Sequence, residues 1–350
     1  MLPTTDVELS IVDLAPIPEG GDAVDAFEGT VERAQQAERL GYSRFWVAEH
    51  HDFPDSIAST TPEVLIPHVA AKTSDIRVGS GTVLLNHYSP YKVAESFSVL
   101  DSLAPGRIDL GLGRATGNPT RDLALQMDRS QRRNPNDHAE KIEEVAKHLH
   151  GGFSAEHPFS GLELPAADDT KPETWVLGSS PSSAKIAGEL GLPYCFAAFI
   201  RPGPAVRAFE VYREHFEPSP FDAGPAEPYG MLAVNATCAE TDEEAARLRA
   251  ATDASSRALR RGQVDQLPIR SVEDAIEYLG SVPEPTELPL EPGEWPRAIS
   301  GSPETMAEIL EDLTSQVGVD EVIIQNQIAD PEDTLRSHEL LAEAVGLESR

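Results

Sequence analysis

Three ionisable residues follow one another at the end of an apolar run, where Glu49, His50 and His51 close the stretch FWVAEHH. Burying such groups costs free energy unless they are paired or used in chemistry. Along an extended strand Glu49 and His51 share one face and His50 points to the other, which is a poor arrangement for a metal ion. Two interpretations remain. One is structural pairing of Glu49 with His51 or a helix dipole, with His50 an ordinary residue, and the other is acid–base chemistry by His50, whose usual pKa lies near neutrality.

A second group of residues is suited to binding an anion. Arg114 ends the glycine-rich stretch RIDLGLGR, and a turn that precedes a predicted helix is rich in serine (Ser179, Ser180, Ser182 and Ser183). Free backbone N–H groups and the positive end of the helix dipole favour an anion at such a turn, and an arginine adds charge. The pattern predicts a phosphate site. Taken separately, the serines could be an ordinary N-cap cluster and Arg114 a surface ion pair.

These residues stand at the ends of predicted strands. The strands are separated by stretches with helical periodicity and cover residues 7–15, 45–51, 76–86, 107–114, 174–178, 193–199, 230–239 and 321–328. Regular alternation of strand and helix predicts an α/β fold with a parallel sheet, and eight such units are what a (β/α)₈ TIM barrel requires. No glycine-rich phosphate loop follows the first strand, which disfavours a doubly wound nucleotide fold. In a barrel, the polar strand ends would meet at one rim.

The charge of the chain restricts its partners. It has 59 acidic and 28 basic residues, a net charge of −31, spread along the sequence. This charge disfavours nucleic acids and anionic membranes as partners, and it predicts a source with a salt-rich cytoplasm. No long apolar run or signal-peptide pattern is visible, so a cytoplasmic location is expected. The two cysteines, Cys195 and Cys238, are expected to be buried core thiols.

One segment, at about 255–300, interrupts the alternation with proline and acidic residues (SVPEPTELPLEPGEWP). We interpret it as an insertion packed on the barrel or acting as a lid, with a mobile surface excursion as the alternative. Residues 1–350 are therefore expected to form a single barrel domain.

Five ordered blocks resemble one family. EHH, GSGTVLLNHYSPYKVAESF, PGRIDLGLGRATG, the serine turn and the C-terminal GSPETMAEILEDLTSQVGVDEVIIQNQI are similar to the bacterial-luciferase-like flavin monooxygenases and oxidoreductases. The resemblance implies a TIM barrel with an insertion before the last helix–strand–helix. It further implies a homodimeric, FMN-dependent monooxygenase that uses dioxygen, a small organic substrate and reduced flavin from a separate reductase. A deazaflavin-dependent hydride-transfer enzyme and a non-catalytic flavin-binding protein are the alternatives.

The resemblance also implies roles for individual residues. His50 matches an active-site histidine that assists the reaction of reduced flavin with dioxygen, and a cis peptide bond under the flavin ring would join Gly81 to Thr82. A role near the flavin or substrate is implied for His87. Gly113 replaces a cysteine of true luciferases, so light emission is not implied. The implied cofactor contacts are Gly81, Thr82, Asn86, Arg114, Ser179, Ser180 and Ser183.

Overall fold

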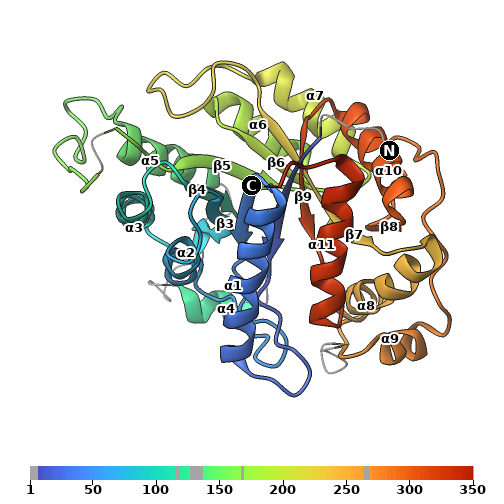
Figure 1. Ribbon diagram of the computed structural model, residues 1–350. Helices are drawn as coiled ribbons and strands as arrows, with labels where there is room; N and C mark the ends of the chain where they lie inside the picture. Colours follow the sequence, from blue (N-terminus) through green and yellow to red (C-terminus); the bar gives the residue numbers. More distant parts are fainter. Residues whose placement is uncertain (1–6, 115–118, 127–136, 167–168, 264–268, 350) are drawn as a thin grey trace.

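Parallel strands close into a barrel with helices on its outside in the computed structural model (Figure 1), which describes residues 7–114, 119–126, 137–166, 169–263 and 269–349. Strands β1 to β6 lie side by side in sequence order and β7 follows β6. Strand β9 lies between β7 and β1 and closes the ring. This is the predicted TIM barrel.

The predicted strands coincide with β1 to β7 and β9. The strands are β1 (Glu8–Asp13), β2 (Arg44–Val47), β3 (Arg77–Leu84), β4 (Ile108–Gly113), β5 (Glu173–Gly178), β6 (Tyr194–Ala197), β7 (Gly230–Cys238), β8 (Ala298–Gly301) and β9 (Glu321–Gln325). The helices are α1 (Ala23–Leu40), α2 (Pro62–Ala70), η1 (Leu85–His87), α3 (Pro90–Leu103), α4 (Pro119–Leu125), α5 (His138–His150), α6 (Pro181–Leu190), α7 (Ala205–His215), α8 (Asp242–Arg261), α9 (Val272–Leu279), α10 (Pro303–Val317) and α11 (Pro331–Val345). Among the described helices, none combines the length and apolar character that crossing a membrane requires.

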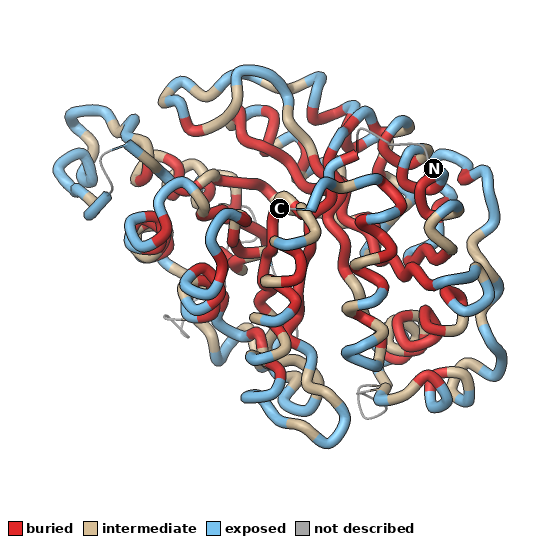
Figure 2. The backbone as a smooth tube through the Cα atoms, viewed as in Figure 1, coloured by how far each residue is buried: buried red, intermediate tan, exposed pale blue. Residues whose placement is uncertain are grey.

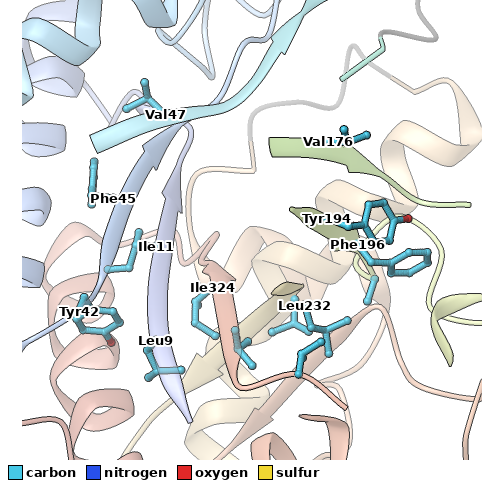
Figure 3. Close-up of a cluster of buried hydrophobic side chains, with 14 of the residues drawn as sticks. Leu9, Ile11, Tyr42, Phe45, Val47, Val176, Tyr194, Phe196, Leu232 and Ile324 are labelled. Atoms are coloured by element: carbon cyan, nitrogen blue, oxygen red, sulfur yellow. The ribbon is translucent and has the colours of Figure 1, made fainter. Parts of the chain in front are cut away.

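Side chains alternate between the two sides of the barrel wall. Figure 3 shows members of the outer cluster, among them Leu9, Phe45 and Ile324, which the strands direct toward the helices. The intervening residues, such as Trp46 and Ile323, form a second cluster inside the barrel. Most strand residues are therefore buried, and Figure 2 shows the centre of the barrel mainly in red, which explains why the strands read as apolar runs.

The first helix illustrates how local sequence sets the element boundaries. The Asp22 side chain accepts a hydrogen bond from the backbone N–H of Val24 at 2.7 Å, and Asp25 accepts one from the Asp22 N–H at 2.8 Å. This capping box satisfies N–H groups that a helix start leaves without partners. Helix α1 ends at Gly41, whose φ of 87° suits glycine, and a Cβ there would lie 2.3 Å from the Glu348 carbonyl oxygen.

A buried charge cluster fills the N-terminal end of the barrel. Arg44 lies 3.0 Å from Asp109, 3.0 Å from Glu321 and 3.2 Å from Glu173. The Trp46 indole N–H donates to Asp109 at 2.8 Å. Burial raises the pKa of Glu321, whereas the carboxylates hold the pKa of Arg44 well above its usual range. Because each charge has partners of opposite sign, the cluster closes the barrel without leaving a buried charge unpaired.

The excursion predicted for 255–300 needs a correction, because helix α8 continues to Arg261 and the short helix α9 follows. Residues 264–268 of this segment lie outside the described residues. Arg249 of α8 donates to the Thr286 hydroxyl at 3.1 Å and to the Glu284 carbonyl at 2.7 Å, so the segment is packed on the barrel's outer layer. Strand β8, which the sequence pattern did not predict, pairs with the end of β7 outside the closed ring.

Candidate active site

A cavity of about 590 Å³ opens at the C-terminal ends of the barrel strands. Its volume lies in the range of small-molecule and cofactor sites, and its position is where such barrels carry their sites. Polar wall residues include His50, Thr82 and Arg114, and apolar ones include Trp46 and Phe199. The cavity brings together residues that lie far apart in the sequence.

The serine turn forms one end of this cavity. Ser180 is the N-cap of α6, and its hydroxyl lies 2.9 Å from that of Ser182. Ser183 donates to the Ser180 carbonyl at 2.7 Å, and its hydroxyl lies 3.1 Å from that of Tyr194. A Cβ on Gly178 would lie 2.1 Å from the Ser183 hydroxyl oxygen, so the absence of a side chain there keeps the turn in place. Hydroxyl groups at a helix N-terminus, with the exposed Arg114 in the same wall, are a donor set that fits a phosphate.

The middle of the wall is formed by strand β3. The peptide bond between Gly81 and Thr82 is cis, the geometry that the family resemblance implies. A Cβ on Gly81 would lie 3.0 Å from Val12 and 3.2 Å from the Trp46 ring, so the backbone runs close above the barrel interior. On β4, a Cβ on Gly113 would lie 2.7 Å from the Thr82 hydroxyl oxygen. The two glycines leave a smooth backbone surface that suits a flat ring.

His50 lies next to this surface and differs in one respect from the sequence-based hypothesis. Burial lowers the pKa of His50 to about 4, and the charges of His51 and Arg121 act in the same direction. The imidazole is therefore neutral near pH 7, not poised to titrate there. Its Nδ1 is buried and has no hydrogen-bond partner among the described residues. A buried ring nitrogen without a partner, in the wall of a cavity, fits a bound molecule that supplies the missing hydrogen bond.

Glu49 pairs with His51, as the structural interpretation predicted. Its carboxylate lies 2.7 Å from His51 Nε2 and accepts hydrogen bonds from the Tyr88 hydroxyl at 2.7 Å and the Leu84 N–H at 2.8 Å. Burial raises the pKa of Glu49 although these donors oppose the shift. The strand itself ends earlier than predicted, at Val47, so the three ionisable residues belong to the loop that follows. Glu49 thereby ties this loop to the end of β3.

Most of the implied cofactor contacts lie in one wall. His50, Gly81, Thr82, Arg114, Ser179, Ser180 and Ser183 all line the cavity. Asn86 does not: β3 ends at Leu84, the chain turns into η1, and the Asn86 amide lies 3.1 Å from His87 Nε2. The described residues of 255–300 are also absent from the wall, so a lid role for this segment stays a prediction. The apolar residues of the wall, such as Leu177 and Ile323, could not be identified from the sequence. The alternation along a strand shows only that they face the barrel interior, not that they border a cavity.

Fold and cavity together define a TIM-barrel protein with a phosphate-compatible turn and a buried histidine in one site. The model of the luciferase-like monooxygenase family matches residues 7–321, and the chain belongs to that family, which indicates an oxidoreductase. The chain is 40% identical to the uncharacterized protein YwcH of Bacillus subtilis, with 97% of this chain and 99% of that protein covered. The crystal structure of apo-MsnO8 superposes with a TM-score of 0.85 at 40% identity, covering 98% of this chain and 100% of that one.

The names of other relatives report different substrates and cofactors. An N-acetyl-S-alkylcysteine monooxygenase of Bacillus subtilis is 36% identical, with 97% of this chain and 98% of that protein covered. The oxygenating constituent of 3,6-diketocamphane monooxygenase from Pseudomonas putida, solved with FMN, has a TM-score of 0.67 at 23% identity, covering 100% of this chain and 99% of that one. An F420-dependent secondary alcohol dehydrogenase, solved with an F420–acetone adduct, has a TM-score of 0.59 at 14% identity, covering 97% of this chain and 99% of that one. The last two similarities concern the fold alone.

Proposed function

We propose that this protein is a monooxygenase that binds reduced FMN and uses dioxygen to oxidise a small organic molecule. The observation that carries the proposal is the continuity of one cavity from Arg114 and the serine turn, past Gly81 and Thr82, to His50. Along the cavity the anion-binding groups come first, then the smooth backbone surface, then the buried imidazole. In FMN the phosphate, the ring and the reacting edge of the ring follow one another in the same order. Family membership supports the same assignment.

The residues divide the work as follows. Arg114, Ser180 and Ser183 hold the phosphate, while the backbone at Gly81 and Thr82 supports the ring. The reduced flavin, when bound, supplies the electrons with which one oxygen atom of dioxygen enters the substrate and the other leaves as water. His50 is a neutral hydrogen-bond partner for the reacting groups and changes its charge little between pH 6 and pH 8, given its pKa of about 4. Trp46 and Phe199 keep the site apolar and exclude water.

Two further elements belong to the proposal. A separate reductase supplies the reduced flavin, and two copies of the chain associate as a homodimer. The relative named for N-acetyl-S-alkylcysteine makes thioethers of that type the first substrates to test.

Anaerobic titration with reduced FMN, and in parallel with a reduced deazaflavin coenzyme, tests the proposal. We expect micromolar or tighter binding of FMN, followed by entry of isotopically labelled oxygen into a substrate after aeration. Tight binding of the deazaflavin alone would identify a hydride-transfer enzyme instead. FMN binding without turnover of any substrate in a broad screen would indicate a flavin-binding protein without catalytic activity.

A further inference from the structure

Two amide side chains lie next to each other, one within β7 and one at the end of β9, strands that Figure 1 shows side by side. Asn235 and Gln325 are partners in the register of these parallel strands. Val234 and Ala236, which flank Asn235, belong to the outer hydrophobic cluster, so Asn235 faces the barrel interior. Gln325 follows the outward-facing Ile324 and therefore also faces inward. Both amides are buried, with exposed fractions of 5% and 6%.

The pair adjoins an apolar part of the cavity wall. Gln325 itself lines the cavity. Ala233 and Ile323 line it as well and belong to the inner hydrophobic cluster. Each stands two residues before one of the amides and therefore lies on the same face of its strand. Cys195 extends this apolar surface from β6. An apolar wall that ends in two amides is a typical recognition surface for a small organic molecule.

The amide oxygens of both residues are little used as hydrogen-bond acceptors within the described part of the chain. Asn235 Oδ1 is buried without a partner, and Gln325 Oε1 accepts only a long bond, 3.3 Å, from Gln327. A buried amide oxygen without a partner costs about 1–3 kcal/mol. The neighbouring Asn326 shows the ordinary structural solution, since its amide donates to the Ser337 hydroxyl at 3.0 Å. The contrast indicates that the amides of Asn235 and Gln325 serve to bind another molecule and not to stabilise the fold.

We propose that Asn235 and Gln325 form a substrate-recognition subsite for the uncharged amide group of a small organic molecule. An amide both donates and accepts hydrogen bonds, and a pair of side-chain amides offers the complementary donors and acceptors. The pair provides no charge to compensate an ion, so a charged group would be desolvated there at large cost. The apolar remainder of the molecule lies on Ala233, Ile323 and Cys195. Within the proposed function this subsite is the substrate end of the cavity.

The test uses two probes of similar shape, N-butylacetamide and butyl acetate, in which an ester oxygen replaces the amide N–H group. Their dissociation constants are measured by NMR titration of the full chain, with and without FMN. We expect the wild type to bind the amide about tenfold more tightly, the equivalent of about 1.4 kcal/mol for its additional hydrogen bonding. Asn235→Leu and Gln325→Leu should each reduce that preference to less than about threefold. Asn326→Leu is the matched control and should retain it.

Thermal unfolding of the same variants separates recognition from structure. Asn235→Leu should leave the unfolding temperature unchanged or raise it, because the variant removes a buried group without a partner, whereas Asn326→Leu should lower it. The proposal is overturned if the wild type binds neither probe or does not distinguish them, or if both leucine variants at the subsite keep the preference. It is also overturned if these variants weaken FMN binding and leave probe binding intact. Failure of the wild type to bind FMN would refute the proposed function while the probe preference without flavin remained measurable.

Discussion

The indole N–H of Trp46 donates to the carboxylate of Asp109 at 2.8 Å and thereby links the floor of the cavity to the charge cluster at the opposite end of the barrel. Arg44 and Arg77 bind the same carboxylate, which is fully buried. The orientation of the cavity floor therefore depends on a group that lies outside the cavity. A change in either residue should affect both stability and the site.

Trp46→Phe tests this link. The variant keeps an aromatic floor but removes one hydrogen bond to a buried carboxylate and some volume, so the free energy of unfolding should fall by about 2–4 kcal/mol. Trp175→Phe is the matched control, because the Trp175 indole nitrogen has no partner within the described residues. Urea unfolding measures both. Equal losses in the two variants would show that volume, not the bond to Asp109, accounts for the effect.

Arg114→Ala should weaken the binding of reduced FMN by about tenfold to a hundredfold, because a charge-assisted bond to phosphate contributes about 1.5–3 kcal/mol. Fluorescence titration measures the change. Arg260→Ala removes an exposed arginine from α8 and should leave FMN affinity unchanged. A riboflavin control, which lacks the phosphate, should bind the wild type and Arg114→Ala equally well; a preference for the wild type would contradict the phosphate assignment.

His50→Ala should retain FMN binding and lose turnover by about a hundredfold or more, the range of a positioned hydrogen-bonding or proton-transfer group. Because the pKa of His50 is about 4, turnover of the wild type should not change around pH 6.5, where an ordinary histidine titrates. The pH profile of kcat measures this directly. Loss of FMN affinity with normal turnover of the remaining complex would reverse the assigned roles of His50 and Arg114.

Much of the fold could be predicted because the barrel strands are continuous apolar runs with both faces buried. The elements that were missed are short: β8 covers Ala298–Gly301, α4 covers Pro119–Leu125 and α9 covers Val272–Leu279, so each repeats its period too few times for the pattern to stand out. The early end of β2 has a long-range cause, since the His50 N–H donates to the Ser59 carbonyl at 2.9 Å. The low pKa of His50 likewise depends on burial and on Arg121, a distant residue. Sequence alone could identify the candidate residue but not its protonation.

His338 should make the protein sensitive to acid. It is fully buried, neither ring nitrogen has a partner within the described residues, and burial lowers its pKa to about 4. The unfolded chain binds a proton near pH 6.5 and the folded chain does not, so stability is complete above pH 6.5 and is lost as the pH falls toward 4. His338→Leu should flatten this loss by up to about 1.4 kcal/mol per pH unit. Urea midpoints across this range measure the slope, and the exposed His68→Leu should leave it unchanged; an unaltered slope in His338→Leu would contradict the assignment.

The net charge of −31 predicts a protein that becomes more stable as salt is added. Repulsion among carboxylates favours the expanded chain, and raising ionic strength from 0.01 M to 1 M shortens the screening length from about 30 Å to about 3 Å. The unfolding temperature should therefore rise steadily with potassium chloride. Sucrose at matched osmolality is the control, because it favours the compact state without screening charge and should stabilise the protein less. Maximum stability at low ionic strength would show that attraction within exposed ion pairs, which salt screens, outweighs the repulsion among carboxylates, and the prediction of a salt-rich source would then fail.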